Sequence, residues 1–179
     1  MYHAGRFGQE MQNRRLWVFR LITFILVPFL LLAGLEGALR FIAPGHPTDF
    51  TTRTVVDGVA VRRENARFAR QFFPAGIARE PLAISFPDEK PESAYRIFVL
   101  GGSSAQGDPE PTYGFSRILG LMLERRYPGV HFEVINTAMT AINSHVVYRI
   151  AREVAGLQGD LFVIYLGNNE VVGPYGAGT

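Results

Sequence analysis

The sequence predicts an α/β domain with a parallel sheet, preceded by a single membrane-spanning helix. Two observations predict this fold class. A long apolar run lies near the N-terminus, and from Tyr95 onward short apolar runs alternate with amphipathic segments. With 179 residues, the chain has room for one ordinary domain and an appendage.

The composition excludes several classes of function. The formal net charge is only +2, from 18 Lys and Arg against 16 Asp and Glu, and the basic residues form no long run, so we expect no nucleic-acid partner. The chain has no Cys, which excludes disulfides, thiolate nucleophiles and Cys-based zinc sites. The remaining charged residues and histidines are scattered, so we expect no metal.

The N-terminal apolar run is long enough to span a bilayer. Leu21–Leu35 carries no charge, and Leu16–Phe19 extends the run to about 20 residues, with only Arg20 interrupting it. Residues 1–15 are then a basic cytoplasmic tail and residues 16–42 a transmembrane helix or signal anchor.

Arginines before the apolar run predict the orientation. By the positive-inside rule, the four arginines Arg6, Arg14, Arg15 and Arg20 leave the N-terminus in the cytoplasm and place the domain outside, as in a bacterial inner membrane facing the periplasm. One alternative is a signal peptide cleaved at Ala33-Gly34 or Gly37-Ala38, which also exports the domain. A buried helix of a soluble protein is the third reading, and the Arg flank and all-round apolarity disfavour it.

Residues 43–93 are expected to form a linker with a small β element. Asp57-Gly58 lies between short β-branched runs, which predicts a hairpin. Phe68, Phe72 and Phe73 are expected to pack against the main domain, with the membrane surface as the alternative. The prolines that follow, with their charged neighbours, predict a linker: Pro81, Pro87 and Pro91.

Residues 94–179 carry the α/β pattern. Apolar runs predict strands at Arg96–Leu100, His131–Ile135 and Leu161–Leu166, and helical periodicity predicts helices at Phe115–Tyr127 and Ser144–Leu157. The third strand is nearly all apolar, which is typical of a central parallel strand covered on both faces. The expected buried faces of the helices are Ile118, Leu119, Met122 and Leu123, and Val147, Ile150, Ala151 and Val154.

Small polar residues follow each predicted strand. The loops are Gly101–Gly107, Asn136–Asn143 and Gly167–Glu170, and in a parallel sheet they meet at one edge. Ser103 follows a buried strand among glycines, where a hydroxyl is exposed and can act as a nucleophile. The backbone N–H of Ala138 and the amide of Asn169 are candidate donors to an oxyanion. Substrate contacts are expected from Gly102, Asn136 and Asn168.

Three segments together resemble a known family. FVLGGSSAQG, VINTAMTAINS and YLGNNE are similar to the first three sequence blocks of the SGNH (GDSL-type) hydrolases, and the similarity extends from Tyr95 to about Tyr175. The resemblance implies a three-layer α/β/α sheet domain of flavodoxin-like type, without a cofactor. It also implies that Ser103 is the nucleophile and Asn169 the oxyanion-hole asparagine.

The sequence departs from the family pattern in several places. Gly102 stands where the family usually has Asp, and Glu170 stands where Asp usually follows the Asn. Ala138 or Ala141 stands near the place of the second block's Gly, and either keeps a backbone N–H. The Asp-x-x-His motif that supplies the family's general base is absent, so we expect the chain to be an incomplete, N-terminal half of the domain.

The chain has four histidines that are candidates for a replacement base. His145 begins the second helix near the loop after the second strand, and a His there is more often a structural or capping residue. His131 opens a strand at the opposite end of the sheet, His46 lies in the linker, and His3 lies in the tail.

The resemblance implies a serine ester hydrolase or acyl transferase that acts on an exported ester or an O-acetylated glycan, and the 179 residues alone are expected to be inactive. The alternative is a catalytically degenerate, membrane-anchored module that binds a glycan or a protein through the same cleft. A nucleotide site in GGSSAQG fails, because neither G-x-x-x-x-G-K-[ST] nor G-x-G-x-x-G is present.

Overall fold

The computed structural model describes residues 4–43 and 45–176, with side chains described from residue 14 onward. The chain divides into two units, residues 1–46 and 47–179.

The first unit is the single helix α1, Ala4–Ile42. Within its Arg14–Ile42 stretch an 18-residue window has a mean hydropathy of 2.4, and by length and composition this is a helix that could cross a membrane. None of the span is buried inside the protein, unlike the core helix of a soluble domain. The helix includes the predicted residues 16–42 and begins 12 residues earlier.

The second unit opens with a small antiparallel sheet of three strands. Strands β1, Thr51–Val56, and β2, Val59–Glu64, form a hairpin. Its turn is Asp57-Gly58, with φ values of 51° and 81°, so the hairpin predicted from these two residues is confirmed. Strand β3, Ser85–Pro87, pairs antiparallel with β2.

Residues 47–93, which were expected to form most of a linker, contain packed strands and buried aromatic residues. Strand β3 lies in the proline-rich segment that was expected to be a linker, and its residue Phe86 is buried. Phe68 is buried with Phe50, their rings 5.2 Å apart, and Phe72 and Phe73 pack against the same cluster. The aromatic residues therefore pack against the domain, as expected, because the burial of Phe side chains is favourable.

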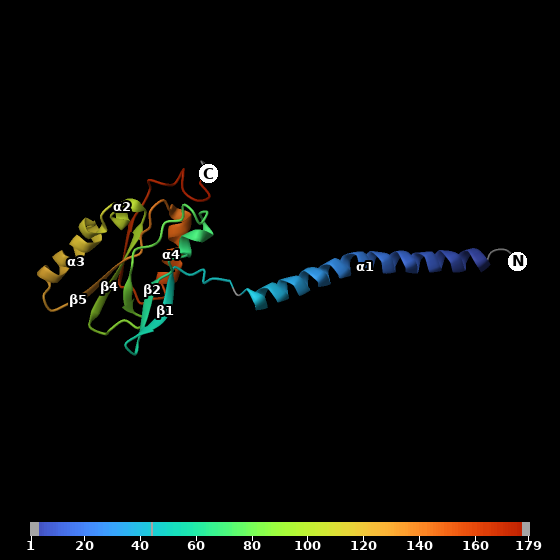
Figure 1. Cartoon of the computed structure of the whole chain (residues 1–179), viewed down its shortest axis with the longest axis horizontal. Coiled ribbons are helices and arrows are strands. Elements are labelled where there is room, and N and C mark those ends of the chain that lie inside the picture. Colours follow the sequence, from blue (N-terminus) through green and yellow to red (C-terminus); the bar gives the residue numbers. More distant parts are fainter. Residues whose placement is uncertain (1–3, 44, 177–179) are drawn as a thin grey trace. The chain divides into compact units, whose positions relative to one another are not determined.

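A parallel sheet of three strands forms the rest of the unit (Figure 1). Strands β4, Ala94–Gly101, β5, His131–Asn136, and β6, Leu161–Tyr165, lie in the order β5-β4-β6, with both pairings parallel. The predicted α/β pattern with a parallel sheet is confirmed.

The strand expected at the centre of the sheet lies at its edge. β4 is central, and Ile97 to Leu100 are buried. In β6, Ile164 is 59% exposed and Tyr165 52%. The apolar composition of β6 is typical of a strand whose two faces are buried. Among the described residues, however, no strand pairs with the outer edge of β6.

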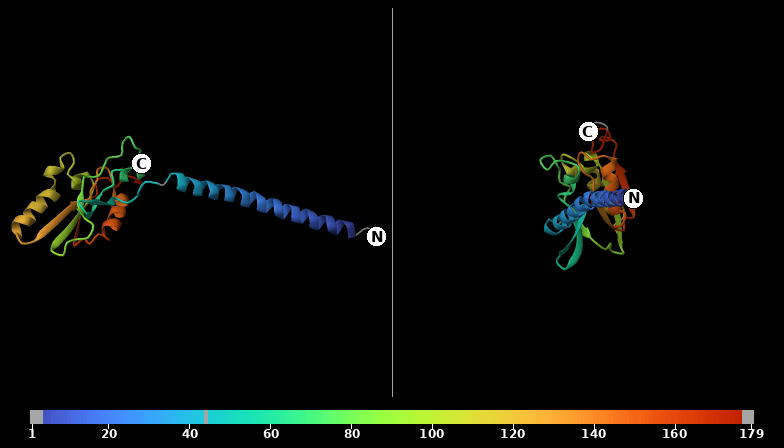
Figure 2. Two further views of the ribbon diagram at one scale, coloured as in Figure 1. Left: turned by 60° about the horizontal axis from the view of Figure 1, so that its bottom comes forward. Right: turned by 90° about the vertical axis from the view of Figure 1, so that its right-hand side faces the viewer.

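Helices lie on both faces of the parallel sheet. Helix α4, Ser144–Val154, shares a buried cluster with Phe98 and Leu100 of β4. Val99, whose side chain points the other way, packs with Ala105 of the four-residue helix α2, Ser103–Gln106, and with Phe115, the first residue of helix α3. Figures 1 and 2 show α3 (Phe115–Arg126) and α4 on opposite sides of the strands.

The two long helices differ in how well their buried faces were predicted. In α4, Val147, Ile150 and Val154 are buried as expected, although the helix ends at Val154 rather than Leu157. In α3, Ile118 and Met122 are exposed, which corrects the expected face. The face toward the sheet carries Ser116, which is buried, and Leu119, Gly120 and Leu123, which are half-buried.

Two charged side chains connect the sheets and helices. Glu153 of α4 accepts hydrogen bonds from the backbone N–H groups of Phe50 and Thr51 and from the Thr51 hydroxyl. Arg96 of β4 is fully buried and donates to the Glu133 carboxylate and to the carbonyl oxygens of Leu157 and Pro87. Both groups thus have the hydrogen bonds that buried or half-buried charges require.

Candidate active site

The first loop places Ser103 at the carboxyl end of the central strand. Strand β4 ends at Gly101, whose φ of 155° lies outside the range that other residues readily adopt. A Cβ at Gly101 would lie 1.9 Å from the Tyr165 carbonyl oxygen, so only glycine fits this turn. Gly102 is the N-cap of α2, and Ser103 is the first helical residue. The loop therefore delivers a half-buried serine directly from a buried strand.

The second loop is fixed against the first by backbone and side-chain hydrogen bonds. The N–H and hydroxyl of Thr137 both donate to the Val99 carbonyl oxygen, and the Met139 N–H donates to that of Gly101. The amide of Asn136 donates to the carbonyl oxygen of Ala105 and to the Ser116 hydroxyl. The loop therefore follows the backbone of the first loop closely.

Two alanines of this second loop have different environments. Ala138 is fully buried, and its N–H donates to the Asn136 side-chain oxygen at 3.1 Å. Ala141 is exposed and has a φ of 65°, a conformation that glycine favours. None of the hydrogen bonds found among the described residues uses the Ala141 N–H. The structure thus places the predicted donor Ala138 beneath the surface and leaves Ala141 at it.

The third loop follows β6 and carries two asparagines. The Asn169 amide nitrogen donates to the Ile142 carbonyl oxygen at 3.0 Å, and that of Asn168 contacts the Ser104 hydroxyl oxygen at 3.3 Å. A Cβ at Gly102 would lie 3.2 Å from the Asn169 amide nitrogen, so Asn169 lies directly against the residue before Ser103. The third loop is therefore in contact with both of the others.

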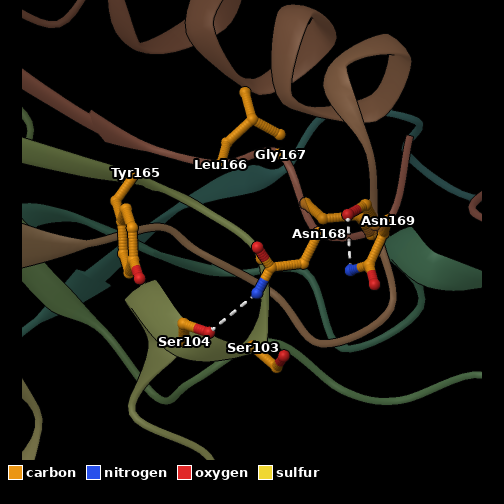
Figure 3. Close-up of a pocket in the computed structure, with 9 residues that line it drawn as sticks. Ser103, Ser104, Tyr165, Leu166, Gly167, Asn168 and Asn169 are labelled. Atoms are coloured by element: carbon orange, nitrogen blue, oxygen red, sulfur yellow. Dashed lines mark hydrogen bonds between the residues drawn. The ribbon is translucent and has the colours of Figure 1, made fainter.

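A small hollow lies where the three loops meet (Figure 3). It is lined by the first turn of α2, by Ile142 and by the segment from Tyr165 to Asn169: Gly102, Ser103, Ser104, Ile142, Tyr165, Leu166, Gly167, Asn168 and Asn169. Of the predicted site residues, Ser103, Gly102, Asn168 and Asn169 line this hollow. Ala138 and Asn136 do not line it, and Asn136 instead holds the end of α2.

Five residues that line the hollow are not among the site residues predicted from the sequence: Ser104, Ile142, Tyr165, Leu166 and Gly167. Tyr165 and Leu166 were assigned to a covered strand, although their place at its carboxyl end was a signal for the site edge. The Ile142 carbonyl oxygen accepts a hydrogen bond from the Asn169 amide, and no residue type predicts such a backbone contact.

Among the described residues, no hydrogen bond joins His131 or His145 to Ser103. His145, the second residue of α4, is exposed, and its ring lies 6.2 Å from that of Tyr175. His131 begins β5, at the end of the sheet away from the hollow. His3 lies outside the described residues. The part of the chain that the structure describes also holds no group of His, Asp and Glu arranged to hold a metal ion.

Comparison of the chain with protein-family models, with curated proteins and with solved structures found no match. The case for a function therefore stands on the sequence motifs and on the arrangement of the three loops.

Proposed function

We propose that the chain carries the nucleophile side of a serine ester hydrolase or acyl transferase of SGNH (GDSL) type, with a three-layer flavodoxin-like sheet domain. The observation that carries the proposal is the meeting of Ser103 and Asn169 at one hollow, from two separate strand ends. Acyl transfer needs a nucleophile and converging hydrogen-bond donors in this relation.

The proposed roles follow from these positions. The Ser103 hydroxyl gives its proton to a general base and attacks the ester carbonyl, while the Ser103 N–H and the Asn169 amide stabilise the oxyanion. The ester C–O bond then breaks, and the alcohol leaves with the proton that the base returns. Water, or the hydroxyl of an acceptor, attacks the acyl-enzyme in turn and releases Ser103. For the donor from the second loop, we propose Ala141 in place of Ala138, because the Ala138 N–H is buried and bonded to Asn136. Asn136 then positions the loops, and Asn168 remains a candidate substrate contact.

The reaction also needs a general base, and the described residues place none beside Ser103. The proposal is therefore tested on the full-length protein. The proposed substrate, an exported ester or an O-acetylated glycan, follows from the resemblance to the SGNH family.

Labelling with a fluorophosphonate probe tests the proposal. The full-length protein should be labelled, the Ser103→Ala variant should not, and Ser93→Ala, in an exposed turn, should be labelled like the unmodified protein. Loss of labelling only in Ser103→Ala would establish an activated serine. Absence of labelling in a folded, unmodified protein would contradict the hydrolase proposal and favour the alternative, a degenerate binding module that uses the same hollow.

We also propose that α1 anchors the protein in a bacterial inner membrane, with its N-terminus in the cytoplasm and the α/β unit in the periplasm. The proposal is supported by the length and hydropathy of Arg14–Ile42 and by the arginines that precede the apolar core. An alkaline phosphatase fused after residue 46 should be active, because this enzyme folds only outside the cytoplasm. An inactive but stable fusion would contradict the orientation.

A further inference from the structure

We propose that Glu170 is a positioning residue that holds Asn169 in place for oxyanion stabilisation, an inference that rests on the proposed function. Glu170 follows Asn169 directly in the chain. Its two carboxylate oxygens each accept a hydrogen bond from Ser144: Oε1 from the backbone N–H at 3.0 Å and Oε2 from the hydroxyl at 2.6 Å.

Ser144 is a fixed point to which a loop can be tied. It is the first residue of α4, an 11-residue helix whose buried face belongs to the main core. The N–H groups of a first helical turn have no partner within the helix, and the positive end of the helix dipole favours a carboxylate there. Glu170 therefore ties the third loop to a rigid element, in a geometry that stabilises both.

Further contacts tie the third loop on the other side of Glu170. The Gly173 N–H donates to the Asn169 carbonyl oxygen at 2.7 Å, and the Asn143 amide donates to the Pro174 carbonyl oxygen at 2.8 Å. A Cβ at Gly173 would lie 2.7 Å from the Cβ of Asn143, so the two loops touch closely. Asn169 and Glu170 thus lie in a short segment held against Asn143 and Ser144, the residues at the start of α4.

The tie determines where the Asn169 side chain lies. Its amide nitrogen is 3.0 Å from the Ile142 carbonyl oxygen, only two residues before Ser144. Asn169 and Glu170 therefore contact the same short stretch, 142–144, through adjacent side chains. Without the carboxylate, the loop loses one of these contacts, and the amide becomes free to move away from Ser103.

The length of the Glu170 side chain fits this role. The SGNH family usually has Asp at the position after the Asn. Taken alone, the Glu at position 170 would therefore favour a degenerate site. The two hydrogen bonds to Ser144 show that the longer carboxylate has a specific partner in this chain. The substitution is therefore compatible with an intact donor arrangement.

The test measures the rate at which the fluorophosphonate probe labels the full-length protein. Glu170→Ala is expected to label about tenfold more slowly, because one preorganised oxyanion donor contributes roughly 10²–10³ in rate and is here displaced rather than removed. Glu170→Gln keeps the side-chain length and one acceptor oxygen, and should be intermediate. Glu92→Ala, at an exposed turn residue, is the matched control and should label at the unmodified rate.

A double variant distinguishes positioning from a purely structural role. If Glu170 acts through Asn169, then Asn169→Ala/Glu170→Ala labels no more slowly than Asn169→Ala alone. Labelling of Glu170→Ala at the unmodified rate, or a multiplicative effect in the double variant, overturns the inference while leaving the proposed function intact. If the unmodified protein is not labelled at all, the proposed function fails and the inference fails with it. Should Glu170→Ala not fold by circular dichroism, the comparison is made with Glu170→Gln.

Discussion

A Cβ at Gly102 would lie 3.2 Å from the amide nitrogen of Asn169. This spacing is tighter than an ordinary van der Waals contact, so the absence of a side chain at Gly102 is what lets Asn169 lie against the residue before Ser103. The backbone at Gly102, with φ of −88°, is accessible to any residue. The glycine is thus required for space and not for conformation.

Gly102→Ala should therefore leave the fold intact and impair the proposed reaction. The Asn169 side chain can shift by a few tenths of an ångström, so the cost in stability should be below about 1 kcal/mol. Fluorophosphonate labelling of Ser103 in the full-length protein should slow by up to about tenfold, because the donor is displaced. Labelling at the unmodified rate would show that the Asn169 amide takes no part.

Gly101→Ala provides the contrast one residue earlier. At Gly101 the φ of 155° is unfavourable for alanine, and its Cβ would lie 1.9 Å from the Tyr165 carbonyl oxygen and 2.6 Å from the Ala105 Cβ. Backbone atoms cannot yield as a flexible side chain does. We expect this variant to fail to fold or to unfold at a much lower temperature, measured by circular dichroism. A stable Gly101→Ala variant would contradict the described turn.

Arg96 is expected to be the most sensitive charged residue of the sheet. Its side chain is fully buried and pairs at 2.7 Å with Glu133, whose side chain is 9% exposed. Arg96→Met leaves that carboxylate buried without its partner and should lower the free energy of unfolding by about 3–5 kcal/mol. In urea denaturation of the chain in detergent, the double variant Arg96→Met/Glu133→Met should recover part of the loss. A double variant as unstable as the single one would show that the carbonyl oxygens of Leu157 and Pro87 dominate.

The pair formed by Arg62 and Asp88 predicts a pH-dependent contribution to stability. The hydrogen bond from Arg62 is the main cause that lowers the pKa of Asp88 below its ordinary value, and the charges of Arg62 and Arg53 act in the same direction against partial burial. A lowered pKa in the folded state means that the contribution is fully present above the unfolded pKa, about 3.9, and is lost as the pH falls through the folded pKa.

Asp88→Asn should accordingly lower the melting temperature of the chain at pH 7. The difference from the unmodified chain should shrink below about pH 4 and disappear once Asp88 is protonated in both states. Asp57→Asn, at the exposed hairpin turn, is a suitable control because no ion pair involves Asp57 among the described residues. A melting difference that stays constant down to pH 3 would exclude the carboxylate charge as its source.

Much of the fold could be predicted, because periodicity reports which side of an element is buried. Val147, Ile150 and Val154 recur at helical spacing, and all three are buried in the core. An Asp-Gly pair between β-branched runs is typical of a hairpin turn, and Asp57-Gly58 forms that turn. In these places a local rule and the tertiary structure agree.

The remaining features depend on tertiary contacts that no local pattern contains. Ile118 and Met122 have helical spacing, but the sheet selects the neighbouring face of α3. Whether Ala138 or Ala141 offers its N–H depends on one backbone torsion and on the Asn136 side chain. The motif placed Ser103 and Asn169 in the loops after two strands. The hydrogen bonds that Ser144 donates to Glu170 join residues 26 apart, so the sequence could not predict them.

The edge strand β6 leads to a last prediction, on solubility. Ile164 is 59% exposed, whereas its neighbour Val163 packs against the cluster that contains Val99 and Ala138. An exposed apolar edge strand promotes association between chains. Ile164→Lys should therefore reduce aggregation of the 179-residue chain, measured by light scattering in a fixed detergent, with little change in melting temperature. Val163→Lys adds the same charge but buries it, and should lower the melting temperature and increase aggregation. Equal behaviour of the two variants would contradict the described facing of β6.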